Sequence, residues 1–306
     1  EVGVHIADVR YYVKENDIID VEAADRSTSV YLVDRVVPML PEILSNEICS
    51  LKADVDRLCY SVILEMNEKS DIISHQIRKT IIHSDKRFTY QDAQDIIDNK
   101  KGLFSDELLI LYKLSKILRD KRFSSGSINF DREEVKFILD KDNNPTDVFF
   151  KESIDTNYLI EEFMLLANKI VAKEIGFVKK GENPKTFVYR VHDKPDEQKI
   201  NSLNNIIKKF GYSINQTTPK NLSNSLNLLL KDVKGKSESN MIETLTIRSM
   251  SKAIYTTNNI GHYGLSFNYY SHFTSPIRRY PDLIVHRLLE KYLNGEKSVE
   301  NNKIEE

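Results

Sequence analysis

The sequence has 306 residues, of which 40% are hydrophobic and 29% are charged, and its formal net charge at pH 7 is −2. This composition is ordinary for a soluble domain with a real apolar core, and no apolar stretch is long enough to span a bilayer. The charge argues against a nonspecific duplex binder, which is usually strongly basic, but it leaves open a protein that encloses a single strand in a locally positive channel.

The first eighty residues are predicted to be mainly β. Strand patterns lie over residues 2–8, 28–32 and 58–66, and residues 73–81 alternate apolar and polar side chains with a period of two. A short helix is expected over residues 20–26. These elements predict a β-rich N-terminal half.

Two helices and a hairpin come next. Thr89 is expected to cap a short helix over residues 90–99, and Ser105 is expected to cap a longer one. The sequence then returns to β, with a hairpin turn at residues 142–145. The predicted strands of this region cover residues 127–130, 135–139 and 146–150.

The C-terminal half is predicted to be rich in helices, with one strand over residues 186–191. One helix begins at Pro195 and stops at Gly211, which is the expected placement of proline and glycine at helix ends. The predicted helices cover residues 157–175, 195–210, 237–255 and 275–293. The fold class is therefore α+β, a single mixed domain with a β-rich N-terminal half and a helix-rich C-terminal half.

The ends of the chain indicate whether it is a whole domain, and its cysteines indicate the redox compartment. The chain opens at Glu1 inside a strand pattern and closes on a polar tail over residues 295–306, so we expect a domain truncated at both ends. Two cysteines, Cys49 and Cys59, do not make a disulfide framework, and no Cys/His cluster has zinc spacing. A reducing cytoplasm is the expected location.

The segment over residues 272–282, HFTSPIRRYPD, is the main candidate for chemistry. Ser275 before a proline predicts a helix start, and Arg278 and Arg279 fall in its first turn. Backbone N–H groups at a helix N-terminus and two arginines together suit a phosphodiester. The alternative is structural: Arg278 pairs with Asp282, and Asp282 with His286.

The same segment carries a family resemblance. HFTSPIRRYPD resembles a signature of the ribonuclease R / ribonuclease II family in its ribonuclease R branch, and GVHIADV at residues 3–9 resembles a strand of that family. Further blocks follow in the family's order at residues 28–32, 38–51, 159–168, 189–195 and 260–265.

The resemblance implies processive 3′→5′ hydrolysis of single-stranded RNA to nucleoside 5′-monophosphates, with Mg²⁺ as cofactor. The family holds the metal with a D-x(5)-D-x-D-D motif that lies upstream of the GVHIADV strand, and a catalytic glutamate lies downstream of the RRYPD helix. Neither matches a residue of this chain, so little activity is expected from it alone. Flanking OB-type RNA-binding barrels are also implied.

The resemblance assigns roles to several residues near the reacting end of the RNA. Arg278 matches the arginine that contacts the scissile phosphate, with Arg279 beside it and Ser275 at the same anion site. Tyr31 matches an aromatic that clamps the terminal nucleotide, and Phe130 matches the aromatic at the other end of the base stack. Read without the resemblance, both aromatics are ordinary core or edge residues.

Other residues look like RNA contacts further along the path. Tyr90 and one of Glu161 or Glu162 occupy such positions. Glu161 and Asn168 are seven apart, hence on one helical face, and could meet ribose hydroxyls. The alternative is that Tyr90 packs and that the two glutamates form a solvated face.

Asp8 and the histidines are weaker candidates. Asp8 ends a strand near the expected metal cluster, but one carboxylate makes no site, and a structural acceptor is the main alternative. His5, His192 and His262 are read as structural histidines.

Two rival functions remain open. One is an RNA-binding module without catalysis, which an intact aspartate motif upstream would exclude. The other is an unrelated phosphate-binding hydrolase that uses Arg278, Arg279 and His286.

Overall fold

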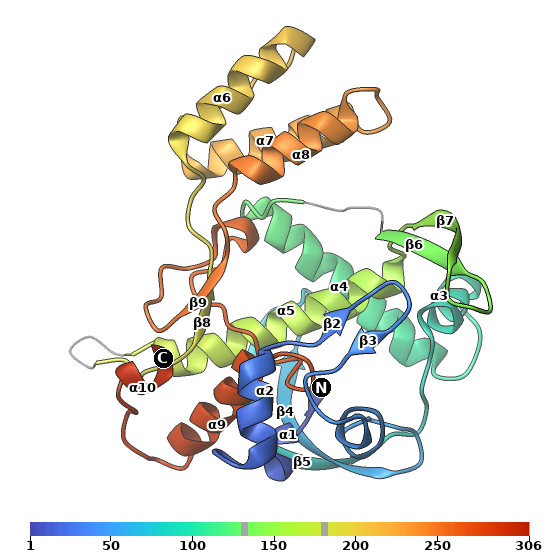
Figure 1. The fold of residues 1–306 in the computed structure, drawn as a ribbon, viewed down its shortest axis with the longest axis vertical. Helices are drawn as coiled ribbons and strands as arrows, with labels where there is room; N and C mark the ends of the chain where they lie inside the picture. The colour runs from blue at the N-terminus through green and yellow to red at the C-terminus, as the bar shows by residue number, and fades with distance from the viewer. Residues whose placement is uncertain (130–133, 179–182, 306) are drawn as a thin grey trace.

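The computed structural model describes residues 1–129, 134–178 and 183–305, and it is a mixed α+β fold as the sequence predicts (Figure 1). The largest sheet is antiparallel and three-stranded, in the order β1–β4–β5. Its register pairs His5 with Ser61 and Ser61 with Arg78. The strands are β1 (Val2–Ala7), β4 (Asp56–Met66) and β5 (Ile72–His83).

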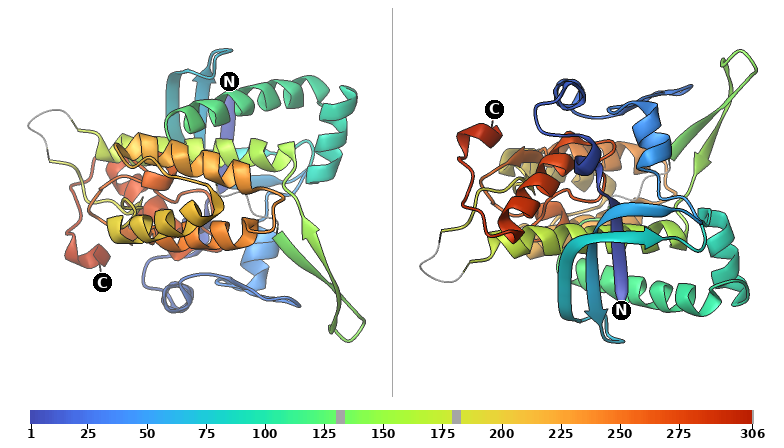
Figure 2. Two further views of the ribbon diagram at one scale, coloured as in Figure 1. Left: turned by 90° about the horizontal axis from the view of Figure 1, so that it is seen from above. Right: turned by 90° about the horizontal axis from the view of Figure 1, so that it is seen from below.

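Three two-stranded ladders complete the described β structure. The β6–β7 hairpin confirms the predicted turn, and both views of Figure 2 show it extending away from the rest of the chain. The ladders pair β2 (Val30–Tyr31) with β3 (Val36–Val37), β6 (Glu134–Leu139) with β7 (Pro145–Lys151), and β8 (Tyr189–Val191) with β9 (Ile254–Thr256).

The helices divide into those around the sheet and those in a separate lobe. The lobe of α6 (Glu197–Ile207), α7 (Pro219–Val233) and α8 (Ser239–Ser249) stands at the top of Figure 1. The others are α1 (Val9–Tyr12), α2 (Ile18–Arg26), α3 (Tyr90–Asn99), α4 (Ser105–Ser124), α5 (Asp155–Gly176), α9 (Tyr280–Leu293), α10 (Asn302–Glu305) and a π-helical turn at Ile43–Ile48.

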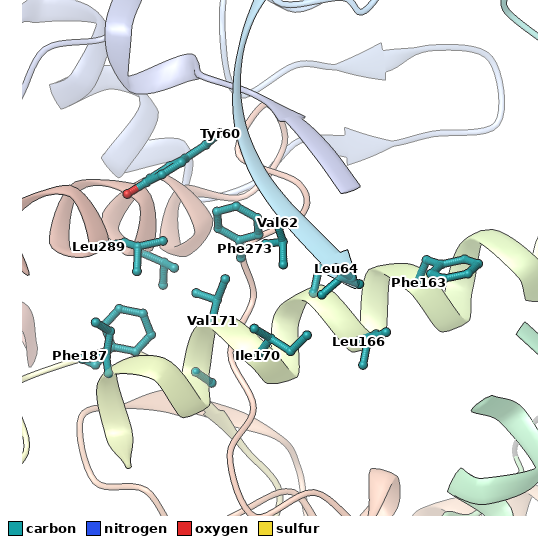
Figure 3. Packing of buried hydrophobic residues seen from close by; sticks show 14 of the residues in the cluster. Tyr60, Val62, Leu64, Phe163, Leu166, Ile170, Val171, Phe187, Phe273 and Leu289 are labelled. Carbon is teal, nitrogen blue, oxygen red and sulfur yellow. The ribbon is translucent and has the colours of Figure 1, made fainter. Parts of the chain in front are cut away.

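The main core lies between β4 and α5. Val62 and Leu64 of β4 face Phe163, Ile170 and Val171 of α5 in the close view of Figure 3, all of them buried. The β-branched and aromatic residues of β4 favour a strand, and the spacing of the apolar residues on α5 gives that helix a buried stripe. This packing fixes α5 against the sheet and so positions the residues that face away from the core.

The helical lobe has an apolar core of its own. Ile200, Leu203, Leu226, Leu229 and Ile242 are all buried there, on three different helices. A third cluster surrounds the N-terminal end of α9 and includes Met39, Leu40 and Leu283.

The sequence predicted most elements but missed some. The helix predicted over residues 237–255 is wrong in its second half: it stops at Ser249, and Ile254–Thr256 forms β9 because these residues pair with β8. The helix α7 was not predicted. Residues 127–129 are not in a strand, because their backbone bonds instead to Gly264 and Asn227, and the rest of that prediction lies outside the described residues.

Candidate functional site

A cavity with a volume of about 620 Å³ lies beside β1. All six residues of β1 line it, and α5 contributes an apolar wall that includes Ile160, Phe163 and Met164. Tyr31 and the segment from Thr274 to Arg278 also line it, as do residues of the 45–51 segment. The cavity is therefore mostly apolar, with an arginine and an exposed aromatic at its border.

The segment before α9 is a turn and not the start of a helix, which corrects the prediction that Arg278 lies in a first helical turn. The backbone N–H groups of Arg278 and Arg279 both donate to the Ser275 carbonyl, at 3.2 and 3.1 Å, and α9 begins only at Tyr280. Proline at position 281 is the physical reason, because a helix begun near residue 276 would need an N–H at 281 that proline lacks. The helix N-terminus therefore does not form the predicted anion site at Ser275.

The two arginines have different environments. Arg279 makes a bidentate ion pair with Asp282, from Nε to Oδ2 at 2.8 Å and from Nη2 to Oδ1 at 2.7 Å. Asp282 is fully buried, and its Oδ1 also accepts from the Ser275 N–H at 2.7 Å. Arg278 is exposed and lines the cavity, so the arginine bound to Asp282 is Arg279 and not Arg278, which the structural alternative from the sequence had paired with it.

Tyr31 lies on β2 with 60% of its surface exposed, and it lines the same cavity as Arg278. Two hydrogen bonds join the segment before Tyr31 to Arg278. The Thr28 hydroxyl and the Ser29 N–H both donate to the Arg278 carbonyl, at 2.9 and 3.1 Å. An exposed tyrosine at a cavity border can stack on a base, which a core tyrosine cannot.

Two predicted RNA contacts on α5 are buried instead. Glu162 forms an ion pair with Arg122, whose Nε lies 3.1 and 3.2 Å from the two carboxylate oxygens. Asn168 accepts from the Phe273 N–H at 2.8 Å and lies 3.4 Å from the Tyr270 hydroxyl. Both side chains are only 3% exposed because they lie on the buried side of α5. Neither can therefore contact a ribose.

Glu161 and Tyr90 remain at the surface but not at the cavity. Glu161 is partly exposed and accepts from Arg122 Nη2 at 3.0 Å. Tyr90 is the first residue of α3, with an exposed ring and a carbonyl that accepts from Thr156 Oγ1. Among the described residues, neither lines the cavity. Phe130 lies outside the described residues.

Asp8 is held as a structural acceptor. It is buried, and its Oδ2 accepts from Arg10 Nη2 at 3.0 Å, while Oδ1 has no partner among the described residues. Burial, which outweighs the nearby Arg10 charge, raises the pKa of this carboxyl. In the part of the chain that the structure describes, no group of three potential ligands comes together. The residues described here therefore do not fit the Mg²⁺ site that the resemblance implies.

The histidines are structural. His192 donates from Nε2 to the Ser251 carbonyl and accepts at Nδ1 from the Gly264 N–H, so it is held as the neutral tautomer. His286 is fully buried against the Phe273 carbonyl, and Arg279 is bound to Asp282. Neither side chain is therefore available to act on a substrate, which argues against an unrelated phosphate-binding hydrolase that uses them. Burial lowers the pKa of His262 to about 3, which keeps it uncharged.

His5 is a cavity residue whose setting the sequence did not reveal. Its Nδ1 lies 2.7 Å from Ser61 Oγ, which in turn lies 2.5 Å from Thr80 Oγ1. Gly3 makes room for the ring, because a Cβ at that position would lie 2.3 Å from His5 Nε2. The sequence signal that could have indicated this close packing is the glycine two residues before the histidine.

Comparison with known proteins defines the class to which this fold and site belong. Residues 1–295 match the RNB domain. The chain therefore belongs to the RNB domain family, which includes the exoribonucleases called ribonuclease R.

The relatives make the relation more specific. Ribonuclease R of Aquifex aeolicus is 39% identical over an alignment of 306 residues, which covers 96% of this chain and 42% of that protein. A structure of Mycoplasma genitalium RNase R in complex with ribose methylated single-stranded RNA matches 95% of this chain and 46% of that chain, with a TM-score of 0.85 and 31% identity. The chain thus spans less than half the length of these relatives.

A third comparison concerns the fold alone. The structure of the yeast pseudonuclease Ssd1 matches 99% of this chain and 37% of that chain, with a TM-score of 0.76 and 21% identity. The fold is therefore found in a protein that is described as a pseudonuclease.

Proposed function

We propose that the chain is the RNA-binding core of a processive 3′→5′ exoribonuclease that hydrolyses single-stranded RNA to nucleoside 5′-monophosphates. The observation that carries this proposal is that Arg278 and Tyr31, far apart in the sequence, line one cavity. In this proposal the guanidinium binds the phosphate to be cleaved and the tyrosine ring stacks on the terminal base.

The roles proposed for this chain are to bind and orient RNA. Mg²⁺ would supply activation of water and stabilisation of the leaving oxygen when bound, but the described residues give it no ligand set. Flanking OB-type barrels in the intact protein and a cytoplasmic location belong to the same proposal. Both cysteines are free and buried, which agrees with a reducing compartment, and no described helix is long and apolar enough to cross a membrane.

The test is equilibrium binding of a fluorescein-labelled single-stranded RNA, measured by anisotropy. Arg278→Ala is expected to weaken binding about tenfold to a hundredfold, the scale of one charge-assisted contact of about 1.5–3 kcal/mol. Arg248→Ala is the matched control, because it removes the same charge from an exposed position on α8. Equal losses in the two variants would show that binding depends on overall charge and not on this site.

In the intact enzyme, Arg278→Lys keeps the charge but loses the planar fork of the guanidinium. We expect single-turnover cleavage to fall on the order of tenfold to a thousandfold, with a much smaller change in RNA affinity. Loss of binding with an unchanged cleavage rate would show that Arg278 only holds RNA.

The second candidate is an RNA-binding module without catalysis. The observation that favours it is the lack of a three-ligand group among the described residues. Mg²⁺-dependent nucleotide release is the discriminating assay. We expect little or none from this chain alone, with Arg278→Ala as the control for contaminating nuclease. A rate close to that of an intact ribonuclease R would contradict this expectation.

A further inference from the structure

The turn from Ser275 to Arg279 is closed by one buried carboxylate. Asp282 accepts three hydrogen bonds from the turn, one from the Ser275 N–H and two from the Arg279 guanidinium, all between 2.7 and 2.8 Å. A buried carboxylate is costly unless its charge and its lone pairs are satisfied, and here the turn itself supplies these partners. The conformation of the turn and the burial of Asp282 therefore depend on each other.

This pairing also decides which arginine remains available. Both oxygens of Asp282 are occupied by Arg279, and by the Ser275 N–H at Oδ1. Among the described residues, the Arg278 guanidinium contacts only Ser275 Oγ, at the long distance of 3.5 Å. Arg279 thus neutralises the carboxylate that would otherwise compete with a phosphate for Arg278.

The outer side of the turn is bonded to the segment that carries Tyr31. The Arg278 carbonyl accepts from Thr28 Oγ1 and from the Ser29 N–H, and the Tyr280 N–H donates to the Ser27 carbonyl at 2.9 Å. Tyr31 follows two residues after Ser29, on β2. A change in the turn is therefore transmitted to the cavity through both Arg278 and Tyr31.

We propose that Asp282 is a positioning residue for RNA binding, which acts by holding the turn that presents Arg278 at the cavity border next to Tyr31. This inference rests on the proposed function, because it assigns Asp282 a task only if Arg278 binds RNA. Asp282 itself does not contact RNA, since its side chain is fully buried.

The chain offers a matched control in Asp20. Its side chain is also buried and accepts from an arginine, Arg287 Nη2 at 2.7 Å, and from the Tyr280 hydroxyl at 2.9 Å. Asp20 joins α2 to α9, and its described partners are the Asn16 N–H, the Tyr280 hydroxyl and Arg287, none of them within residues 275–279. Asp20→Asn and Asp282→Asn thus each remove a carboxylate whose side chain is at most 5% exposed, but only Asp282 is bonded to the turn.

The experiment is RNA binding by anisotropy with the 306-residue chain, well below the melting temperature of each variant. We expect Asp282→Asn to weaken binding about threefold to tenfold, within the usual range of coupling between contacting residues. Asp20→Asn is expected to change it less than twofold. In the Arg278→Ala background, Asp282→Asn is expected to weaken binding by a smaller factor than in the unsubstituted chain, which a purely structural role would not produce.

If Asp282→Asn fails to fold, Arg279→Lys replaces it, because lysine keeps the positive charge beside Asp282 but loses the bidentate fork that ties the turn to this carboxylate. It is expected to weaken binding in the unsubstituted chain and less in the Arg278→Ala background. Equal effects of the substitution in both backgrounds would overturn the positioning role while leaving RNA binding at Arg278 intact. If Arg278→Ala binds RNA as well as the unsubstituted chain, the proposed function of the cavity fails and the positioning role fails with it.

Discussion

Replacing Glu162 with glutamine should destabilise the fold by about 3 kcal/mol, whereas the same change at Glu161 should cost less than ~1 kcal/mol. Glu162 is buried and binds Arg122 Nε and Nη2, while Arg122 Nη1 donates to Ser127 Oγ at 3.0 Å. Removing the carboxylate charge leaves the buried guanidinium of Arg122 with the half-exposed carboxylate of Glu161 as its remaining acid partner, and this partner does not reach Nε. Glu161 has a side chain that is 44% exposed, so water replaces much of what its charge loses.

The measurement is urea unfolding followed by far-UV circular dichroism, since the chain has no tryptophan. RNA affinity should stay unchanged in Glu162→Gln, because this glutamate points into the protein while its neighbours Ile160 and Phe163 line the cavity. Equal destabilisation by the two variants would refute the buried ion pair. A loss of RNA affinity confined to Glu162→Gln would restore the role that the sequence suggested for this residue.

Two further predictions use the ring of Tyr31 and the buried histidines. Tyr31→Ala should weaken single-stranded RNA binding by ~1–3 kcal/mol, the usual contribution of one stacked base, and an unchanged affinity would contradict stacking. Tyr31→Trp should introduce a single tryptophan whose fluorescence RNA quenches. Burial lowers the pKa of His262 and His272 to about 3, whereas a histidine in the unfolded chain has a pKa near 6.5. Between these two values the unfolded chain binds more protons than the folded one. The free energy of unfolding should therefore fall as the pH drops from 6.5 toward 3, by up to ~1.4 kcal/mol per pH unit for each histidine. Urea unfolding at pH 7.5 and 5.5 measures this, and equal stability at both values would contradict it.

The elements that the sequence predicted best are those with local signals. Thr89 forms the expected cap of α3, and the segment in which polar and apolar residues alternate in sequence forms β5. The fold class and the hairpin at residues 142–145 were likewise predictable, because turn residues and periodicity act over a few positions. The family resemblance was equally visible, since it depends on short ordered motifs.

What the sequence could not provide depends on long-range contacts. Glu162 looks like a surface residue until Arg122, forty positions away, is placed beside it. The start of α9 was predicted too early because Pro281 lacks the N–H that a helix begun near residue 276 would need, and the bonds from Ser275 and Arg279 to Asp282 close a turn there instead. The meeting of Arg278 with the segment before Tyr31 joins positions about 250 residues apart, and no local pattern encodes it.

The pairing of charges inside the fold sets the salt dependence that we expect for the proposed RNA binding by a chain of net charge −2. Several basic residues are committed to buried or partly buried ion pairs, so they do not add to a positive surface; they are Arg10, Arg122, Arg279 and Arg287. Among the described residues that line the cavity, Arg278 is the only arginine or lysine. One or two phosphate contacts predict that log K falls with log salt with a slope of only about −0.7 to −1.4, because each phosphate on a single strand contributes about −0.7. The slope is measured from binding isotherms at about 50 to 300 mM salt, a range over which the Debye length changes enough to screen surface charge. A slope several times steeper would show that a broad basic surface, and not stacking in the cavity, holds the RNA.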